Sequence, residues 1–180
     1  LEVDENSFLL LNLFSYVPKE STIYKNVKKL LPGSKIQIDS DNFTIKKFFE
    51  FKPNNNIYKL KNLLNRSVKI QSRSDVSVGS LLSGGLDSSL ISKLHSLIFL
   101  KNRIKIFFYN FYDEKYSEEF YSNIMSKNIN SIHHISKNKK INLSEIINII
   151  ELLDEPIIDT AIFTSFKLSV LAKKNDVKVI

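Results

Sequence analysis

The chain contains no cysteine, which excludes disulfide bonds and thiolate metal sites. This absence is typical of a reducing compartment, so we expect a cytoplasmic protein. Glycine and proline are also scarce, with four of each in 180 residues, so each one marks a turn informatively. Long apolar runs are missing as well. The run at residues 8–14 is too short to cross a membrane, and the acidic residues before it argue against a secretory signal peptide.

Arginine is the third scarce residue type. The net charge is +7, but the 26 cations include only Arg66, Arg73 and Arg103, and the lysines are scattered along the chain. Arginine is the usual partner of phosphates and base edges, so a solvated, lysine-rich surface explains the charge better than a nucleic-acid site. We therefore expect no nucleic-acid and no membrane partner, and the sequence leaves the oligomeric state open.

Local patterns change near residues 52–56, a polar segment that reads Lys-Pro-Asn-Asn-Asn and is the best candidate linker. Before it we predict a helix at residues 9–16, a turn at 31–33 and a hairpin formed by residues 34–39 and 43–48. After it, helical and strand patterns alternate. Helices are predicted at residues 57–70, 87–100, 117–129, 143–153 and 162–173, and strands at 76–82, 104–109, 131–135 and 177–180. This order predicts an α/β fold, a parallel sheet covered by helices on both faces.

The segment at residues 83–89 carries the chemical signal. It reads Ser-Gly-Gly-Leu-Asp-Ser-Ser and lies between a predicted strand and a predicted helix. Adjacent glycines allow close approach of a ligand to the backbone, and the start of the helix offers free N–H groups and a positive dipole end. The serine hydroxyls add further donors. Together these features predict a cradle for a phosphate chain, with Asp87 holding a Mg²⁺ ion between itself and the phosphates.

Two other interpretations of this segment explain it less well than a phosphate cradle does. It lacks the lysine of the G-x-x-x-x-G-K-[ST] loop, so it is not built for transfer of a γ-phosphoryl group. A serine-capped helix start after a glycine turn, with Asp87 placed to suit the helix dipole, would explain parts of the string. It does not explain all seven residues between a strand and a helix.

The segment resembles the pyrophosphate loop of the N-type ATP pyrophosphatases. Its flanks at residues 16–33, 73–89 and 154–159 resemble the family of glutamine-hydrolysing asparagine synthetases, in the same order along the chain. The resemblance implies a three-layer nucleotide-binding fold of the adenine nucleotide alpha hydrolase type. Residues 1–52 would be the C-terminal remnant of a class II glutamine amidotransferase domain, and residues 57–180 the N-terminal half of the ATP pyrophosphatase domain.

The same resemblance implies an activity. ATP would activate a carboxylate as an acyl-adenylate with release of pyrophosphate, and ammonia from a glutaminase domain would then displace AMP. Aspartate is the default acceptor; a sugar, peptide or β-lactam precursor carboxylate, or a non-catalytic nucleotide-binding remnant, are the alternatives. Asp87 would bind Mg²⁺, and the implied ATP-binding residues are Leu82 through its backbone, Ser83, Gly84, Gly85, Leu86, Asp87, Ser88, Ser89 and, beside adenine, Tyr109.

Departures from the family pattern accompany the match. Asn110 stands where the family usually has glycine, and a second glycine–acidic loop would follow Ile180. We therefore assign no catalytic residue within these 180 residues and expect no turnover from them alone. Strand-end histidines are the default interpretation of His133 and His134, rather than a metal site. Asp154, Glu155 and Asp159 are assigned to loop shape rather than to a ligand, and a substrate-side role for Glu119 is kept as an alternative.

Overall fold

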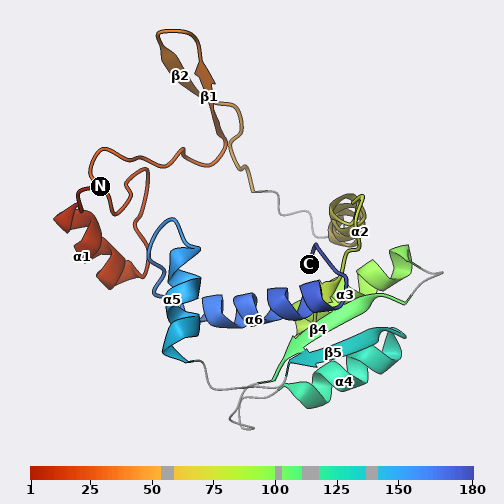
Figure 1. Ribbon diagram of the computed structural model, residues 1–180. Coiled ribbons are helices and arrows are strands. Elements are labelled where there is room, and N and C mark those ends of the chain that lie inside the picture. Colours follow the sequence, from red (N-terminus) through yellow and green to blue (C-terminus); the bar gives the residue numbers. More distant parts are fainter. Residues whose placement is uncertain (54–58, 100–102, 111–117, 137–141) are drawn as a thin grey trace. The chain divides into compact units, whose positions relative to one another are not determined.

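The computed structural model describes residues 1–53, 59–99, 103–110, 118–136 and 142–180 (Figure 1). The chain divides into two compact units. The first comprises Leu1–Asn55 and Ile150–Thr160, and the second comprises Asn56–Ile149 and Ala161–Ile180. The assignment of these parts to two family domains stays a prediction. In the described residues, no helix has the length and apolarity needed to cross a membrane.

The first unit opens with helix α1, Glu5–Phe14. The predicted helix began at residue 9, but Asp4 caps the helix earlier because its carboxylate accepts a hydrogen bond from the Ser7 N–H at 2.8 Å. Hydrogen bonding from the side chain of Ser7, and secondly from its backbone N–H, lowers the pKa of the Asp4 carboxyl. Ser15 ends the helix in the left-handed region, with φ of 63°. The unit's core is a small apolar cluster that consists of Leu11, Val17 and Ile23, with Tyr24 against it.

The predicted hairpin is present. Strands β1, Ser34–Ile38, and β2, Phe43–Lys47, pair antiparallel as a separate two-stranded sheet. Gly33 fixes the entry to this sheet, because its carbonyl accepts hydrogen bonds from the N–H groups of Phe48 and Phe49. A Cβ at Gly33 would lie 2.3 Å from the Phe49 carbonyl oxygen, so no other residue fits this turn unchanged.

The second unit alternates helices and strands as predicted. In chain order it contains α2 (Leu60–Gln71), β3 (Ser80–Leu81), α3 (Leu86–Ile98), β4 (Lys105–Tyr109), α4 (Glu119–Asn128), β5 (Ile132–Ser136) and α6 (Ala161–Lys174), and α5 (Leu143–Glu151) ends within the returning segment of the first unit. The three strands form a parallel sheet in the order β3-β4-β5. Parallel pairing follows from the right-handed crossovers that helices provide.

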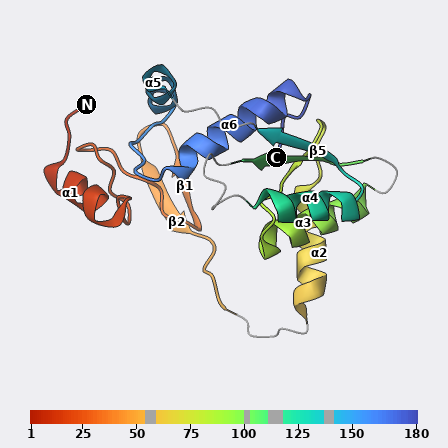
Figure 2. The same ribbon diagram turned by 90° about the horizontal axis from the view of Figure 1, so that it is seen from below.

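Helices cover both faces of the sheet (Figures 1 and 2). On one face Leu82, Ile104, Ile106 and Ile129 form a buried cluster, with Phe99 and Met125 from the ends of α3 and α4 packed on it. On the other face Phe107 of β4 packs against Leu168 and Ala172 of α6. Neighbouring strand residues point to opposite faces, so Ile106 and Phe107, each 0% exposed, occupy the two cores side by side.

The order in which the chain adds strands to the sheet reverses at β3. The Leu82 N–H donates to the Phe107 carbonyl of β4, whereas the Gly79 N–H donates to the Val179 carbonyl at 2.8 Å. Residues an odd number of positions apart in a parallel strand present their hydrogen-bonding groups to opposite sides, so Val179 lies beside β3 on the side away from β4. The chain therefore runs outward from β3 to β5 and returns to the other side of β3, which makes β3 a topological switch point.

Two predicted strands differ from the structure. The strand expected at residues 76–82 is reduced to Ser80–Leu81, and the one expected at 177–180 is reduced to a single parallel bridge between Val179 and Val78. In the second of these segments Val177 is 2% exposed and packs against Phe107 and α6, whereas Val179, which forms the bridge, is 41% exposed. Residues 57–58, 100 and 117, which bounded three predicted helices, and residues 54–56 of the predicted linker lie outside the described residues.

Candidate functional site

The loop at residues 83–89 lies at the carboxyl edge of the parallel sheet. Strand β3 ends at Leu81, which pairs with Phe107, and β4 continues to Tyr109 at the same edge. In open α/β sheets, ligands bind outside the carboxyl ends of the strands where the strand order reverses. The predicted loop therefore occupies the position that this topology favours for a ligand.

Serine hydroxyls organise the loop from within. The hydroxyls of Ser83 and Ser88 lie 2.9 Å apart, and the Ser83 backbone N–H donates to Ser88 Oγ at 3.2 Å. Ser88 Oγ also donates to the Gly85 carbonyl at 3.2 Å, and the Gly85 N–H donates to Ser83 Oγ at 3.3 Å. These local bonds hold the loop as a closed turn, with both hydroxyls at its centre.

Gly84 places the loop against helix α4. Its φ is +99°, and a Cβ added there would lie 2.9 Å from both the Glu118 carbonyl oxygen and the Ser122 nitrogen. Only a residue without a side chain permits this approach. Gly85 differs, because its φ of −68° is ordinary and the nearest atom to an added Cβ is Ser83 Oγ at 3.4 Å.

The start of α3 faces outward from the loop. Gly85 occupies the N-cap position with no side-chain cap, so the first N–H groups of the helix are left for another acceptor. The carboxylate of Asp87, in the first turn, is exposed and forms no hydrogen bond or ion pair within the described part of the chain. Leu86, the first residue of α3, is 84% exposed. Ser89 lies within the first turn and its N–H bonds to the Gly85 carbonyl at 3.1 Å.

The two remaining predicted ATP-binding residues flank the loop. Leu82 is 1% exposed, its N–H donates to the Phe107 carbonyl at 3.0 Å, and its own carbonyl accepts from the Ser122 hydroxyl at 3.1 Å. Tyr109 is half-buried at the end of β4 and packs beside the cluster under α6. Both lie at the edge that carries the loop; their contact with a nucleotide stays a prediction.

A polar chain leads from Leu82 into α4 and β5. The Ser122 hydroxyl, which is fully buried, also lies 3.1 Å from Nε2 of His133, and Nδ1 of that ring lies 3.1 Å from the side-chain amide of Asn123. Burial lowers the pKa of His133, and the carboxylate of Glu119 opposes this shift more weakly. Burial therefore favours the neutral form of the His133 ring.

Asn110 and Glu119 join the ends of β4 and α4. The Asn110 side-chain amide donates to a carboxylate oxygen of Glu119 at 2.5 Å, and the Asn110 N–H donates to the Ser136 carbonyl at 3.3 Å. The residue that departs from the family pattern is thus bonded to the glutamate for which a substrate-side role was the alternative. Glu118 precedes the helix and makes no side-chain cap.

The other two histidines belong to the core. Nδ1 of His95 in α3 lies 2.6 Å from the Ser80 hydroxyl of β3, and its ring meets Phe99 edge-on. His134 stacks on Phe107 with ring centroids 5.2 Å apart. Burial lowers the pKa of both rings, and for His134 the charge of Lys105 acts in the same direction. Within the described residues no group of histidines and carboxylates has metal-site geometry.

The acidic–proline segment lies in the first unit. Glu155 forms an ion pair with Lys29 at 3.1 Å, so this carboxylate holds the returning segment Ile150–Thr160 to the N-terminal part of the same unit. That contact supports the loop-shaping role predicted for Glu155. The same role for Asp154 and Asp159 stays a prediction.

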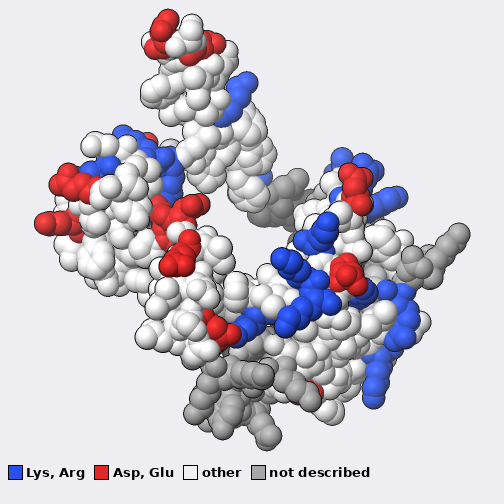
Figure 3. All heavy atoms as spheres, viewed as in Figure 1, with Lys and Arg blue, Asp and Glu red and all other residues white. Residues whose placement is uncertain are grey.

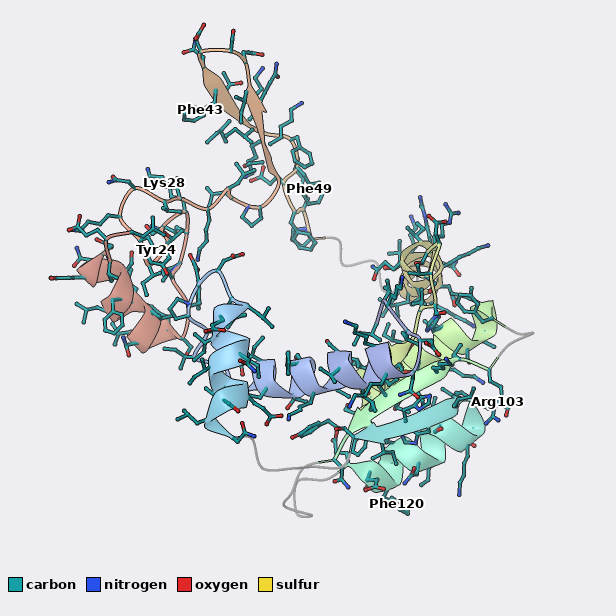
Figure 4. All side chains as sticks on the ribbon, in the orientation of Figure 1. Tyr24, Lys28, Phe43, Phe49, Arg103 and Phe120 are labelled. Carbon is teal, nitrogen blue, oxygen red and sulfur yellow. The ribbon has the colours of Figure 1, made fainter. Side chains whose placement is uncertain are left out.

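A hollow of about 660 Å³ lies at the opposite, amino edge of the sheet. Four cations line it, but two of them are engaged. Arg103 (Figure 4) donates to the carbonyls of Asn130 and Ser131 after α4, and Lys105 donates to the Asn175 carbonyl after α6. Figure 3 shows Lys and Arg spread over much of the visible face of this unit. The hollow therefore reflects helix ends capped by cations rather than the predicted chemistry.

Sequence reasoning missed Ser122 and Asn123. Serine spacing was the available signal, because Ser122 and Ser126 are one turn apart in α4 and both are buried. A buried serine in a helix is satisfied either by its own backbone or by a neighbouring element, and the sequence does not distinguish the two.

Three comparisons with known proteins bear on this site. The family described as asparagine synthase matches residues 59–180, which include the whole loop. A Bacillus subtilis protein named asparagine synthetase (glutamine-hydrolysing) 1 is 31% identical over 97% of the chain and 29% of its own length. A Methanocaldococcus jannaschii protein, provisionally named asparagine synthetase (glutamine-hydrolysing) 2, is 31% identical over 96% of the chain and 35% of its own length.

The chain thus spans about a third of the length of these relatives. Among solved structures, the NH₃-dependent NAD synthetase of Campylobacter jejuni is similar with a TM-score of 0.43 and 15% identity, over 67% of this chain and 53% of that one.

Proposed function

The chain belongs to the asparagine synthase family, and from that premise we propose that the whole protein carrying it forms an amide at the expense of ATP. A carboxylate is activated as an acyl-adenylate with release of pyrophosphate, and ammonia derived from glutamine displaces AMP. Aspartate is the proposed acceptor. A sugar, peptide or β-lactam precursor carboxylate would use the same loop.

One observation carries the proposal: the closed Ser-Gly-Gly turn lies at the topological switch point, directly before the uncapped start of α3. The paired hydroxyls of Ser83 and Ser88, the backbone at Gly84 and Gly85, and the first N–H groups of α3 are all donors or close-approach positions. Such an arrangement suits an anion with several oxygens, and the dipole of the helix adds to the attraction.

Asp87 fits a Mg²⁺ ion. Its carboxylate is exposed in the first turn of α3, and within the described residues nothing neutralises it. A carboxylate beside phosphate oxygens is unfavourable unless a cation lies between them, and Mg²⁺ is commonly held by one or two carboxylates together with substrate phosphates. The ion would neutralise charge on the pyrophosphate leaving group.

The residues of this chain contribute mainly by positioning. Loops that grip pyrophosphate hold the leaving group of attack at the α-phosphorus, and no lysine in the loop is available for transfer of the γ-phosphoryl group. Exposed Leu86 and half-buried Tyr109 leave apolar surface at the same edge, which suits the adenosine part of the nucleotide.

Product analysis tests the proposal. The whole protein, given ATP, Mg²⁺, aspartate and ammonia, is expected to release AMP and pyrophosphate, which ³¹P NMR distinguishes from ADP and phosphate. Appearance of ADP would reject the pyrophosphatase assignment. AMP formation with another carboxylate but not with aspartate would retain the chemistry and change the acceptor, and nucleotide binding without turnover would favour the non-catalytic alternative.

Binding measurements test the metal ligand. Asp87→Asn should weaken binding of ATP·Mg about tenfold or more, because the ion loses a charged ligand. Asp75→Asn is the matched control, since Asp75 is also exposed but lines the hollow at the opposite edge of the sheet. Equal affinity of the Asp87→Asn variant and the parent protein would remove Asp87 from the metal site.

A further inference from the structure

The entry to the loop is held by one buried serine of α4. The Leu82 carbonyl, at the junction between β3 and the loop, lies in a residue that is only 1% exposed and accepts the Ser122 hydroxyl at 3.1 Å. Ser122 is itself 0% exposed, so water cannot replace it.

The hydrogen-bond directions in this contact are determined by chemistry. Ser122 has one hydroxyl proton, which it donates to the Leu82 carbonyl, so the 3.1 Å contact with His133 must be donated by Nε2–H of the ring. In the neutral ring Nδ1 then accepts, whereas the Asn123 atom placed 3.1 Å from it is Oδ1, which is also an acceptor. Rotating the Asn123 side-chain amide by 180° exchanges its oxygen and nitrogen, so that its N–H group donates to Nδ1. His133 therefore fixes the Ser122 hydroxyl, and Ser122 fixes Leu82.

The same part of α4 touches the loop a second time. A Cβ at Gly84 would lie 2.9 Å from the Ser122 nitrogen, so the first turn of α4 forms the wall against which the loop rests. A shift of Leu82 would move the loop along this wall and displace the hydroxyls of Ser83 and Ser88 that follow it.

We propose that Ser122 and His133 are positioning residues, which set the place of the phosphate-binding loop through the Leu82 carbonyl. The inference rests on the proposed function, because it concerns how the same loop binds phosphates. Neither residue contacts the ligand. Both act by holding the entry of the loop in one position, so that binding does not have to order it.

The chain offers a matched control for each residue. Ser126 is a second buried serine on α4, one turn later, but its hydroxyl bonds to the Ser131 hydroxyl at 2.8 Å and not to the loop. His134 is the next residue of β5, and its ring stacks on Phe107 on the other face of the sheet. Replacing either control removes a comparable interaction while leaving both hydrogen bonds of Leu82 in place, the one from its N–H to the Phe107 carbonyl and the one from Ser122 to its own carbonyl.

The experiment measures affinity for inorganic pyrophosphate with Mg²⁺, and for ATP·Mg, by titration calorimetry of the whole protein and its folded variants. Ser122→Ala and His133→Leu should each weaken both ligands about five- to tenfold, the size of one neutral hydrogen bond. The double variant should bind each ligand at most about twofold more weakly than Ser122→Ala does, since both changes act through one contact. His133→Gln should restore binding, because its amide supplies a donor near the position of Nε2.

The control variants Ser126→Ala and His134→Leu should bind like the parent even where thermal unfolding shows them destabilised. If Ser122→Ala binds pyrophosphate like the parent, or if Ser126→Ala weakens it equally, the positioning role is overturned while the proposed function stands. If the parent binds neither pyrophosphate nor ATP, the proposed function falls and this inference falls with it.

Discussion

At the scale of single residues, Gly84 meets two separate requirements. Its φ of +99° is one that side chains rarely adopt, and its neighbours in α4 leave no room for a Cβ. Gly85 beside it meets neither requirement, although the two glycines look alike in the sequence. Only the structure separates them, because the wall that excludes a Cβ comes from a helix more than thirty residues later.

We predict that Gly84→Ala lowers the free energy of unfolding by about 1–3 kcal/mol, through backbone strain and overlap with the start of α4. Gly85→Ala is the control and should cost about 1 kcal/mol or less, because its backbone is ordinary and the nearest atom can give way. Urea unfolding followed by circular dichroism measures both. Equal losses would mean that the loop does not rest against α4.

The loop could be predicted from the sequence because its residues are adjacent, and the strand–helix context came from hydrophobic periodicity. Ser122 and His133 could not, because their contact with Leu82 joins three elements that are separated along the chain. The predicted strand at residues 177–180 is present only as the parallel bridge at Val179, for a related reason. An apolar side chain such as Val177 signals burial, whereas ladder pairing depends on the neighbouring backbone.

At the scale of elements, the two sheets differ in what supports them. Strand β4 lies between two parallel neighbours with helices on both faces, and Ile106 and Phe107 are 0% exposed. The hairpin β1–β2 has an apolar face that includes Ile38, 74% exposed, and Phe43, 65% exposed (Figure 4). A two-stranded hairpin with no cover on its apolar face is marginal in water.

We predict that backbone amides of the hairpin exchange with deuterium at least about a hundredfold faster than those of β4, because they open without unfolding the second unit. Hydrogen-exchange mass spectrometry of the 180-residue chain, comparing peptides that cover residues 34–47 and 105–109, measures this difference. Equal protection would show that another part of the chain covers the hairpin.

At the scale of the whole molecule, the three histidines affect the pH dependence of stability in the same direction. Burial is the main cause that lowers the pKa of His95, His133 and His134 below the ordinary value of 6.5. The unfolded chain therefore binds protons more readily than the folded chain. The contribution of each neutral ring to stability is present above about pH 6.5 and is lost as the pH falls through that value towards the folded-state pKa.

We predict that the free energy of unfolding falls between pH 7 and pH 5, by at most about 1.4 kcal/mol per pH unit for each histidine, and that the urea midpoint falls with it. His95→Gln should flatten this dependence, since His95 is the most buried of the three rings and the change removes its titration. A midpoint that is constant or rises on acidification would contradict the assignment of neutral, buried rings.

The ion pair between Lys29 and Glu155 bears on how the protein is made. The first unit consists of two segments, Leu1–Asn55 and Ile150–Thr160. Glu155 leaves the ribosome roughly 125 residues after Lys29, which takes about 6–25 s at ordinary rates of translation. During that interval the N-terminal segment is exposed without its partner, while most of the parallel sheet is already synthesised. Of the residues in this chain, a chaperone that binds nascent chains would be needed longest at residues 1–55, which wait for the returning segment.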